Sequence, residues 1–162
     1  MSDNRYTPRD IVGQRFCIPL YQRLFAWTPK EVRKLLADLK EHFDSERFQK
    51  EHNAYYLGML TAIVREGGDI DLIDGQQRFT VMILMAIAFK HLSEWELFLN
   101  AGKRLKLVAR SEDENYLRIL ANDDNLYNHL NKGNSCSSYE NLYMKNASLC
   151  IKDYVEETFS DA

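Results

Sequence analysis

A short polar segment separates two apolar stretches in the middle of the chain, where residues 72–89 read LIDGQQRFTVMILMAIAF. The apolar residues before this segment predict a strand, and those after it predict a buried helix. A turn that only reverses the chain has little need of a carboxylate, two amides and a guanidinium together. We therefore ask what these side chains face.

In a strand–turn–helix unit, the first helical turn presents unpaired backbone N–H groups and a partial positive charge, which together bind anions. Gly75 would let an anion approach the backbone, and Arg78 could offer a planar fork to phosphate oxygens. Gln76 and Gln77 could donate to phosphate or position an attacking water, and Thr80 adds a hydroxyl. This pattern predicts a nucleotide-phosphate site that is not a Walker P-loop.

Asp74, at the end of the predicted strand, leaves more than one role open. Its carboxylate could hold a divalent cation, orient a water molecule or fix Arg78. A purely structural alternative also stands, because Asp-Gly is a common turn and an Asp–Arg pair often only pins a loop. The turn alone therefore does not choose between a ligand site and a structural element.

A second polar cluster stands upstream, in the segment IPLYQRLFAW, where a proline ends a predicted strand. Its polar members are Tyr21, Gln22 and Arg23. The aromatic residues Phe25 and Trp27 could stack on a base while Arg23 reaches a phosphate. In the alternative, both aromatic residues are core anchors and Arg23 is a surface cation; for Trp27 we favour the core.

Together, the motifs IPLYQRLFAW, YYLGML and LIDGQQRFT resemble the N-terminal domain of GmrSD-type restriction endonucleases, the DGQQR domain. The resemblance covers roughly residues 11–120, and KRLKLVARSEDENYLRIL matches the Arg-Leu strand and helix of that family. Three motifs in the correct order are far more specific than one. A departure is Phe79-Thr80-Val81, where the family usually has Leu-Thr-Thr, so the second threonine is absent.

The resemblance implies a ParB/sulfiredoxin-like α/β (α+β) fold, a small mixed sheet flanked by helices, in which a turn at a helix N-terminus binds nucleotide phosphates. Related domains hydrolyse nucleoside triphosphates with Mg²⁺ and gate a nuclease directed at foreign DNA. The signature turn is matched by Asp74, Gly75, Gln76, Gln77 and Arg78, and the upstream motif by Tyr21, Gln22 and Arg23.

We therefore expect a nucleotide-binding, triphosphate-hydrolysing sensor or regulatory domain of a bacterial restriction system that defends against phage. The expected catalytic residues are Asp74, Gln77 and Arg78, the expected nucleotide-binding residues are Tyr21, Gln22, Arg23, Gly75, Gln76 and Thr80, and Asp74 would also hold Mg²⁺. The alternative is a non-catalytic nucleotide- or nucleic-acid-binding regulatory module, because the sequence offers no clear general base and no paired carboxylates.

A nuclease activity of the chain by itself is not expected. The four histidines, none in an HNH-like pattern, are His42, His52, His91 and His129. The chain would be a fragment or a stand-alone regulator, and DNA would be reached through a nuclease domain or a partner chain. The preferred nucleobase and association into a homo-oligomer are left open.

Composition narrows the function classes further. A net charge of −3 and a pI of about 5.8 argue against binding duplex DNA by bulk electrostatics. Three cysteines without a CxxC pair suggest reduced thiols. The longest apolar run, near residues 81–89, is too short to span a bilayer. A cytoplasmic protein without membrane contact is the expectation.

The chain is expected to form a domain at residues 1–130 and a linker with a helical extension at 131–162. We predict strands at 16–18, 55–64, 70–73 and 104–108, and helices at 29–43, 76–92, 93–100, 112–120 and 138–159. Residues 46–53 are predicted to be a polar loop. The helix at 112–120 is expected to turn Tyr116, Ile119 and Leu120 inward. The last helix has no obvious partner and is expected to be the least stable.

Overall fold

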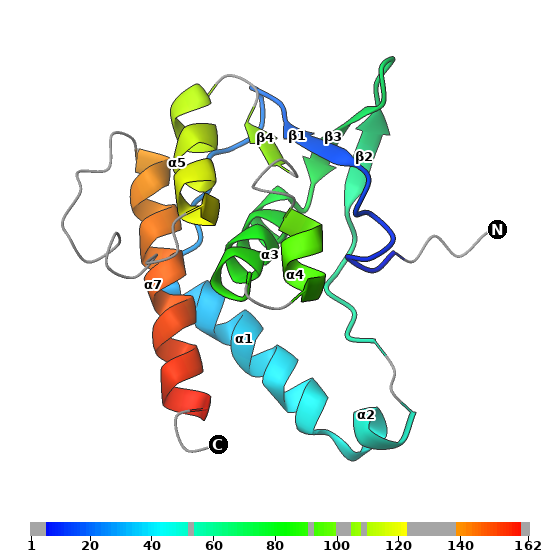
Figure 1. Ribbon diagram of the computed structural model, residues 1–162, viewed down its shortest axis with the longest axis vertical. Helices are drawn as coiled ribbons and strands as arrows, with labels where there is room; N and C mark the ends of the chain where they lie inside the picture. Colours follow the sequence, from blue (N-terminus) through cyan, green and yellow to red (C-terminus); the bar gives the residue numbers. More distant parts are fainter. Residues whose placement is uncertain are drawn as a thin grey trace.

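The computed structural model describes residues 6–51, 54–90, 93–99, 105–107, 110–122 and 139–159. The strands found there are β1 (Arg15–Ile18), β2 (Thr61–Val64), β3 (Asp69–Asp74) and β4 (Leu105–Leu107). The helices found there are α1 (Pro29–Asp44), α2 (Glu46–Glu51), α3 (Gln76–Ala88), α4 (Ser93–Leu99), α5 (Ser111–Asn122) and α7 (Tyr139–Phe159). Figure 1 shows the sheet at one end of the molecule, with α1 and α7 extending away from it. This mixed arrangement confirms the predicted α+β fold class.

The described strands form one sheet in the order β2-β3-β1-β4. The central strand β1 pairs in parallel with both β3 and β4. β2 pairs antiparallel with β3 and forms a hairpin with it. Its turn contains Gly67 and Gly68, whose positive φ angles of 103° and 88° suit glycine. Because β1, β3 and β4 are parallel, their carboxyl ends lie along the same edge of the sheet.

The predicted strand at residues 55–64 is too long, because β2 begins only at Thr61. The interruption has a local cause at Gly58, where φ is 109° and the backbone leaves the extended conformation. Tyr55 is half-buried and Tyr56 is exposed, and both precede the strand. Residues 54–60 instead form an irregular segment that reaches the start of α3.

The predicted start of α1 is confirmed by its capping box. The Thr28 hydroxyl accepts from the N–H of Lys30 at 3.3 Å, and the Thr28 N–H donates to the Glu31 carboxylate at 2.8 Å. The Thr28 hydroxyl also donates to the Glu31 carboxylate, and this bond, together with the one from the Thr28 N–H, holds the pKa of Glu31 below its ordinary value. The cap fixes the helix start from local sequence alone.

The predicted loop at residues 46–53 is wrong over residues 46–51, which form the short helix α2. The Ser45 hydroxyl accepts from the Phe48 N–H at 3.2 Å and caps the new helix. Two ion pairs at i,i+4 spacing, Lys50–Glu46 and Arg47–Glu51, both span 3.1 Å. Such pairs support a polar helix that lacks any buried residue.

The helix α3 lies in the hydrophobic core and is apolar on most sides. Its fully buried side chains are Phe79, Val81, Ile83, Leu84, Ala86 and Ile87. Phe79 lies against Phe16 of the sheet, with ring centroids 4.6 Å apart. The helix ends at Ala88, earlier than the predicted residue 92. A helix buried to this degree holds its first turn, which carries the polar motif, in a fixed place.

The helices α4 and α5 complete the cover of the core. Phe98 is buried, and Trp95, which packs against the core, meets its ring edge-on with centroids 6.1 Å apart. In α5 the predicted inward stripe is partly wrong, since Ile119 is 48% exposed. Leu120 is buried as predicted, Tyr116 packs against the core, and Leu117 rather than Ile119 completes the buried face.

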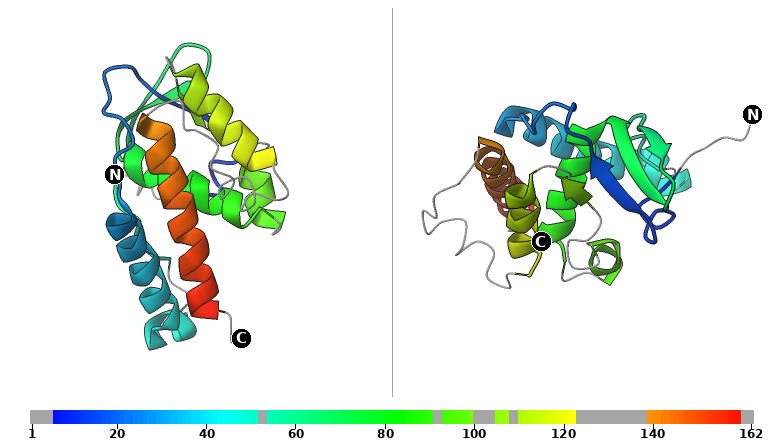
Figure 2. Two further views of the ribbon diagram at one scale, coloured as in Figure 1. Left: turned by 90° about the vertical axis from the view of Figure 1, so that its left-hand side faces the viewer. Right: turned by 90° about the horizontal axis from the view of Figure 1, so that it is seen from above.

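The expectation that the last helix lacks a partner is wrong. α7 packs against α1 and α3, and Figure 2 shows α1 and α7 side by side. Arg33 of α1 forms two hydrogen bonds with Glu157 of α7, both at 2.8 Å. The buried residues of α7 are Met144, Ala147, Ser148, Cys150 and Ile151. The predicted linker at residues 131–138 lies outside the described residues.

Cys17 and Cys150 are buried, and neither is part of a disulfide bond among the described residues. The third cysteine, Cys136, lies outside the described residues. No helix in the described ranges has the length and apolar character needed to cross a membrane. The compartment itself remains a prediction.

Candidate functional site

The polar motifs gather at the edge of the sheet where the parallel strands end. β3 runs directly into Gly75 and α3, and β1 runs through Pro19 into the loop that carries Tyr21, Gln22 and Arg23. In parallel sheets, ligands bind outside the carboxyl ends of the strands. The structure thus brings the two polar clusters of the sequence to the place where such folds bind ligands.

Gly75 is the N-cap of α3 and has the left-handed angles φ 86° and ψ 3°. A Cβ at this position would lie 2.3 Å from Cδ2 of Leu60 and 3.1 Å from the carbonyl oxygen of Met59. Two features therefore favour glycine at position 75: the left-handed backbone angles and the close approach of residues 54–60. The first helical N–H groups of α3 begin beside this narrow contact.

Arg78, in the first turn of α3, is held by a backbone carbonyl. Its Nη2 donates to the Met59 oxygen at 2.8 Å, and its Cζ lies 3.0 Å from where a Cβ of Gly58 would stand. Its Nε is buried and has no partner among the described residues. The structure shows no ion pair between Arg78 and a described carboxylate, and Asp74 is exposed. Arg78 therefore does not pin the turn through Asp74.

Two glutamine side chains join the upstream loop to the turn. Gln77 is 4% exposed; its Oε1 accepts from the Ala26 N–H and its Nε2 donates to the Leu24 carbonyl, both at 2.8 Å. Gln22 donates to the carbonyl of Ile73 at 2.9 Å. These hydrogen bonds of Gln77 and Gln22 hold the loop after β1 against the end of β3 and the start of α3. These contacts could not be predicted from the sequence, because the partners are backbone groups about 50 residues away along the chain.

Gln76 completes the connection between the two motifs. Its Nε2 donates to Oε1 of Gln22 at 3.3 Å, and its backbone carbonyl accepts from the Thr80 hydroxyl at 2.8 Å. Thr80 is 1% exposed, so its hydroxyl is committed within the helix. A ligand could reach this hydroxyl only after the bond to Gln76 is broken.

The aromatic residues of the upstream loop divide between core and surface. Phe25 is buried and Trp27 is half-buried against the core, which confirms the core interpretation for both. Tyr21 is 71% exposed, and Arg23 is exposed as well. Tyr21 and Arg23 thus remain the side chains of this loop that a ligand could contact directly.

Asp74 is the expected metal ligand. It is exposed, and no group of three or more potential metal-ligating side chains is found in the described ranges. Mg²⁺ is commonly held by one or two carboxylates together with phosphate oxygens of the substrate. A lone exposed carboxylate at the strand end fits this mode and does not fit a permanent protein-only site.

Arg110, which the sequence interpretation did not single out, also reaches the site. It precedes α5, and its Nη2 donates to the carbonyl of Gln22 at 3.4 Å. The carbonyl of Arg110 accepts from the N–H groups of Asp113 and Glu114 at 3.0 and 3.2 Å. Arg110 follows β4 as the other two polar motifs follow β1 and β3. This position could have identified it from the sequence as a residue of the site.

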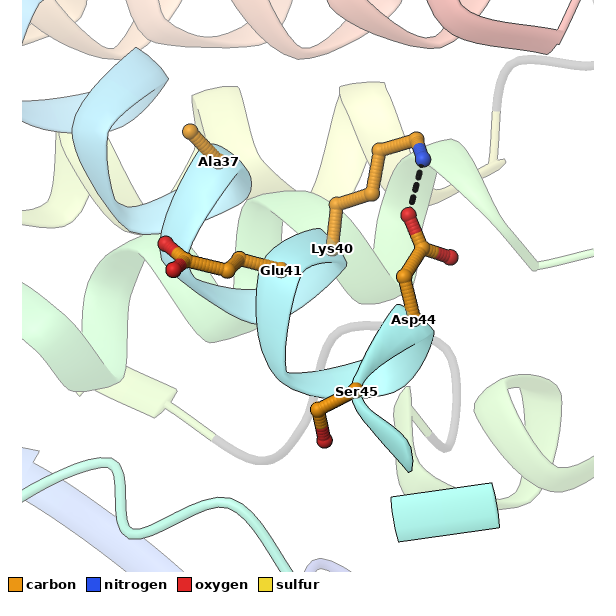
Figure 3. Close-up of a pocket in the computed structure, with 5 residues that line it drawn as sticks. All are labelled: Ala37, Lys40, Glu41, Asp44 and Ser45. Carbon is orange, nitrogen blue, oxygen red and sulfur yellow. Dashed lines mark hydrogen bonds and ion pairs between the residues drawn. The ribbon is translucent and has the colours of Figure 1, made fainter. Parts of the chain in front are cut away.

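An open hollow of about 580 Å³ lies elsewhere, along α1 (Figure 3). It is lined by Ala37, Lys40, Glu41, Asp44 and Ser45. Lys40 and Asp44 pair with each other. The hollow shares no residue with the polar motifs and has no aromatic lining, so its chemistry is that of a solvated helix surface.

Comparison with protein families gives one match over almost the whole chain. A family model described as the GmrSD restriction endonuclease, N-terminal domain, matches residues 8–159. No curated protein and no solved structure matches the chain in the corresponding comparisons. The matched range extends through α7 and includes every polar residue described above.

Proposed function

The chain belongs to the family of GmrSD restriction endonuclease N-terminal domains, and on that premise we propose that it is a nucleotide-binding sensor or regulatory domain of a bacterial restriction system. It hydrolyses nucleoside triphosphates and reaches DNA through a nuclease domain or a partner chain. A ParB/sulfiredoxin-like fold and a cytoplasmic location belong to the same proposal.

The observation that carries the proposal is the state of Arg78. Its guanidinium stands at the positive end of α3, is bound by the Met59 carbonyl and has no described carboxylate to neutralise it. A cation held in place without a counter-charge, beside unpaired helical N–H groups, is suited to bind phosphate.

The other residues take roles that follow from their contacts. Arg23 is exposed and would neutralise charge that develops on the phosphates during transfer. Tyr21 offers a ring on which a base can stack. Gln77 and Gln22 act as positioning residues, because both ends of the Gln77 amide and the Gln22 nitrogen hold backbone groups.

Asp74 is the carboxylate that would hold Mg²⁺ together with the phosphate oxygens. When bound, Mg²⁺ supplies positive charge that offsets the charge of the phosphates. Gly75 keeps the approach to the first N–H groups of α3 free of a side chain. Gln76 fixes Gln22 at the same edge.

A binding module without turnover is the second candidate. It is favoured by the single exposed carboxylate at the site and by the lack of a metal-ligating cluster in the described ranges. A triphosphatase needs a group that orients the attacking water, and Gln77 is 4% exposed with its amide bonded to Leu24 and Ala26, which makes it poorly accessible for this role.

A thermal-shift panel with the four ribonucleoside triphosphates, each with and without Mg²⁺, tests binding. We expect at least one triphosphate at about 100 times its Kd to stabilise the fold by about 2.7 kcal/mol. Release of inorganic phosphate over background then separates the enzyme from the binding module. Absence of any shift at millimolar concentrations, supported by calorimetry, would overturn both forms of the proposal.

A further inference from the structure

Three parallel strands end at the same edge of the sheet, and an arginine follows each of them. Arg78 comes after β3, Arg23 after β1 and Arg110 after β4. Since the strand order is β3-β1-β4, the three connections leave this edge in the order of Arg78, Arg23 and Arg110. Adjacent strands are about 4.8 Å apart, so these connections extend over about 10 Å.

Gln22, after the central strand, touches both neighbouring connections. Its side-chain nitrogen donates to the Ile73 carbonyl in β3, and its side-chain oxygen accepts from Gln76 in the turn. Its backbone oxygen accepts from Arg110. One residue therefore separates Arg110 from the turn that carries Arg78, although the two arginines are far apart in sequence.

We propose that Arg110 is a third anion-binding residue of the phosphate site and that it contacts the part of a polyphosphate chain farthest from Arg78. The inference rests on the proposed nucleotide binding and adds a residue and a direction to it. A row of cationic connections about 10 Å long suits a chain of phosphates better than a single phosphate group. The Arg110 side chain reaches this edge, where it donates to the carbonyl of Gln22.

The test compares Arg110→Gln with Arg118→Gln. Arg118 lies on α5, the helix that Arg110 precedes, and binds Glu114 and Asn115 at 2.8 and 3.2 Å. Isothermal titration measures the affinity for inorganic tripolyphosphate, for the triphosphate that the parent binds best and for the matching nucleoside monophosphate. We expect Arg110→Gln to weaken both polyphosphates about tenfold or more and the monophosphate less than about twofold. Arg118→Gln should bind all three like the parent.

The outcomes separate this inference from the proposed function. If Arg78→Ala loses polyphosphate affinity and Arg110→Gln binds like the parent, the role of Arg110 is refuted and the site stands. If the parent binds no triphosphate, the proposed function fails. An equal loss for monophosphate and polyphosphate would show that Arg110 only supports Gln22, and would refute its role as an anion ligand.

A variant that fails to fold does not end the test. If the melting curve shows that Arg110→Gln is unfolded at the assay temperature, Arg110→Lys decides. Lysine keeps the charge and loses the planar fork. The inference requires Arg110→Lys to bind tripolyphosphate at least about threefold more weakly than the parent, and parent-like affinity overturns it.

Discussion

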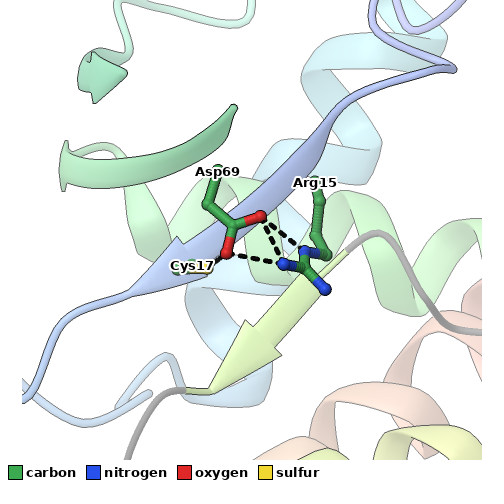
Figure 4. A network of polar contacts seen from close by, with 3 residues as sticks. All are labelled: Arg15, Cys17 and Asp69. Carbon is green, nitrogen blue, oxygen red and sulfur yellow. Dashed lines mark hydrogen bonds and ion pairs between the residues drawn. The ribbon is translucent and has the colours of Figure 1, made fainter. Parts of the chain in front are cut away.

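Arginines at the two ends of the sheet differ in what holds them. Near the start of β3, Arg15 forms a bidentate pair with Asp69 at 2.6 and 2.7 Å, and the Cys17 thiol lies 3.9 Å from the same carboxylate (Figure 4). Arg65 likewise pairs with Asp71, with an Nε–Oδ2 distance of 2.7 Å. Past the end of β3, the partner of Arg78 among the described residues is the backbone carbonyl of Met59. Arginine is therefore paired with a carboxylate at one end of the sheet, and at the other end its described partner is an uncharged carbonyl.

This difference separates structural arginines from ligand-binding ones. A carboxylate raises the pKa of Arg15 and of Arg65 through hydrogen bonding and charge, and it also satisfies the donors of the guanidinium. A carbonyl satisfies one donor and leaves the charge in place. We infer that the end of the sheet with carbonyl-bound arginine is the one prepared for an anion.

The largest effect on stability is expected from Gly75→Ala. The left-handed backbone costs about 1 kcal/mol for a residue with a Cβ, and the collision with Leu60 and Met59 adds about 1–3 kcal/mol. Urea denaturation should show a loss of about 2–4 kcal/mol in the free energy of unfolding.

Gly67→Ala is the matched control for this substitution. Its φ is 103°, yet nothing lies within 4 Å of an added Cβ, so only backbone strain is expected. Equal losses for the two variants would show that the contact between residues 54–60 and Gly75 does not shape this end of the sheet.

A smaller loss is expected from Gln77→Ala, which removes both hydrogen bonds to the loop after β1. The free energy of unfolding should fall by about 1–3 kcal/mol, because backbone groups of Leu24 and Ala26 lose their partners. Gln49→Ala, which breaks one exposed bond to the Phe43 carbonyl, should change it by less than about 0.5 kcal/mol. If the Gln77→Ala protein were as stable as the parent and its loop after β1 were unmoved, the hydrogen bonds of Gln77 would not be what holds this loop.

The smallest expected effect is that of low pH on stability. Protonation of a carboxylate should weaken its ion pair with arginine, whereas a hydrogen bond from arginine to a backbone carbonyl should not change. Hydrogen bonding to Arg33, and then its charge, lowers the pKa of Glu157 below its ordinary value. The pair therefore stabilises the fold above the unfolded pKa of about 4.3, and this stability is lost as pH falls through the folded pKa. Glu157→Gln should reduce the stability difference between pH 7 and pH 3 in urea denaturation. An unchanged difference would mean that this pair makes no contribution.

Local signals made part of this structure predictable. The Thr28 capping box defined the start of α1, and the glycines between β2 and β3 defined the hairpin. The partner of α7 was not predictable, because the contact of Arg33 with Glu157 joins distant parts of the chain. The sequence also placed Arg78 and Gln77 in one motif, but their different partners, Met59 for one and the loop of Leu24 for the other, depend on tertiary contacts.

The central claim is that Arg78 binds phosphate and Arg15 does not. Calorimetric titration of Arg78→Ala and Arg15→Ala with the best-bound triphosphate, after melting curves confirm that both are folded, tests it directly. Loss of a charge-assisted contact worth about 1.5–3 kcal/mol predicts an affinity about 10- to 100-fold lower for Arg78→Ala. Arg15→Ala should bind the triphosphate within about twofold of the affinity of the parent. A folded Arg78→Ala protein that binds the triphosphate as tightly as the parent would contradict the account.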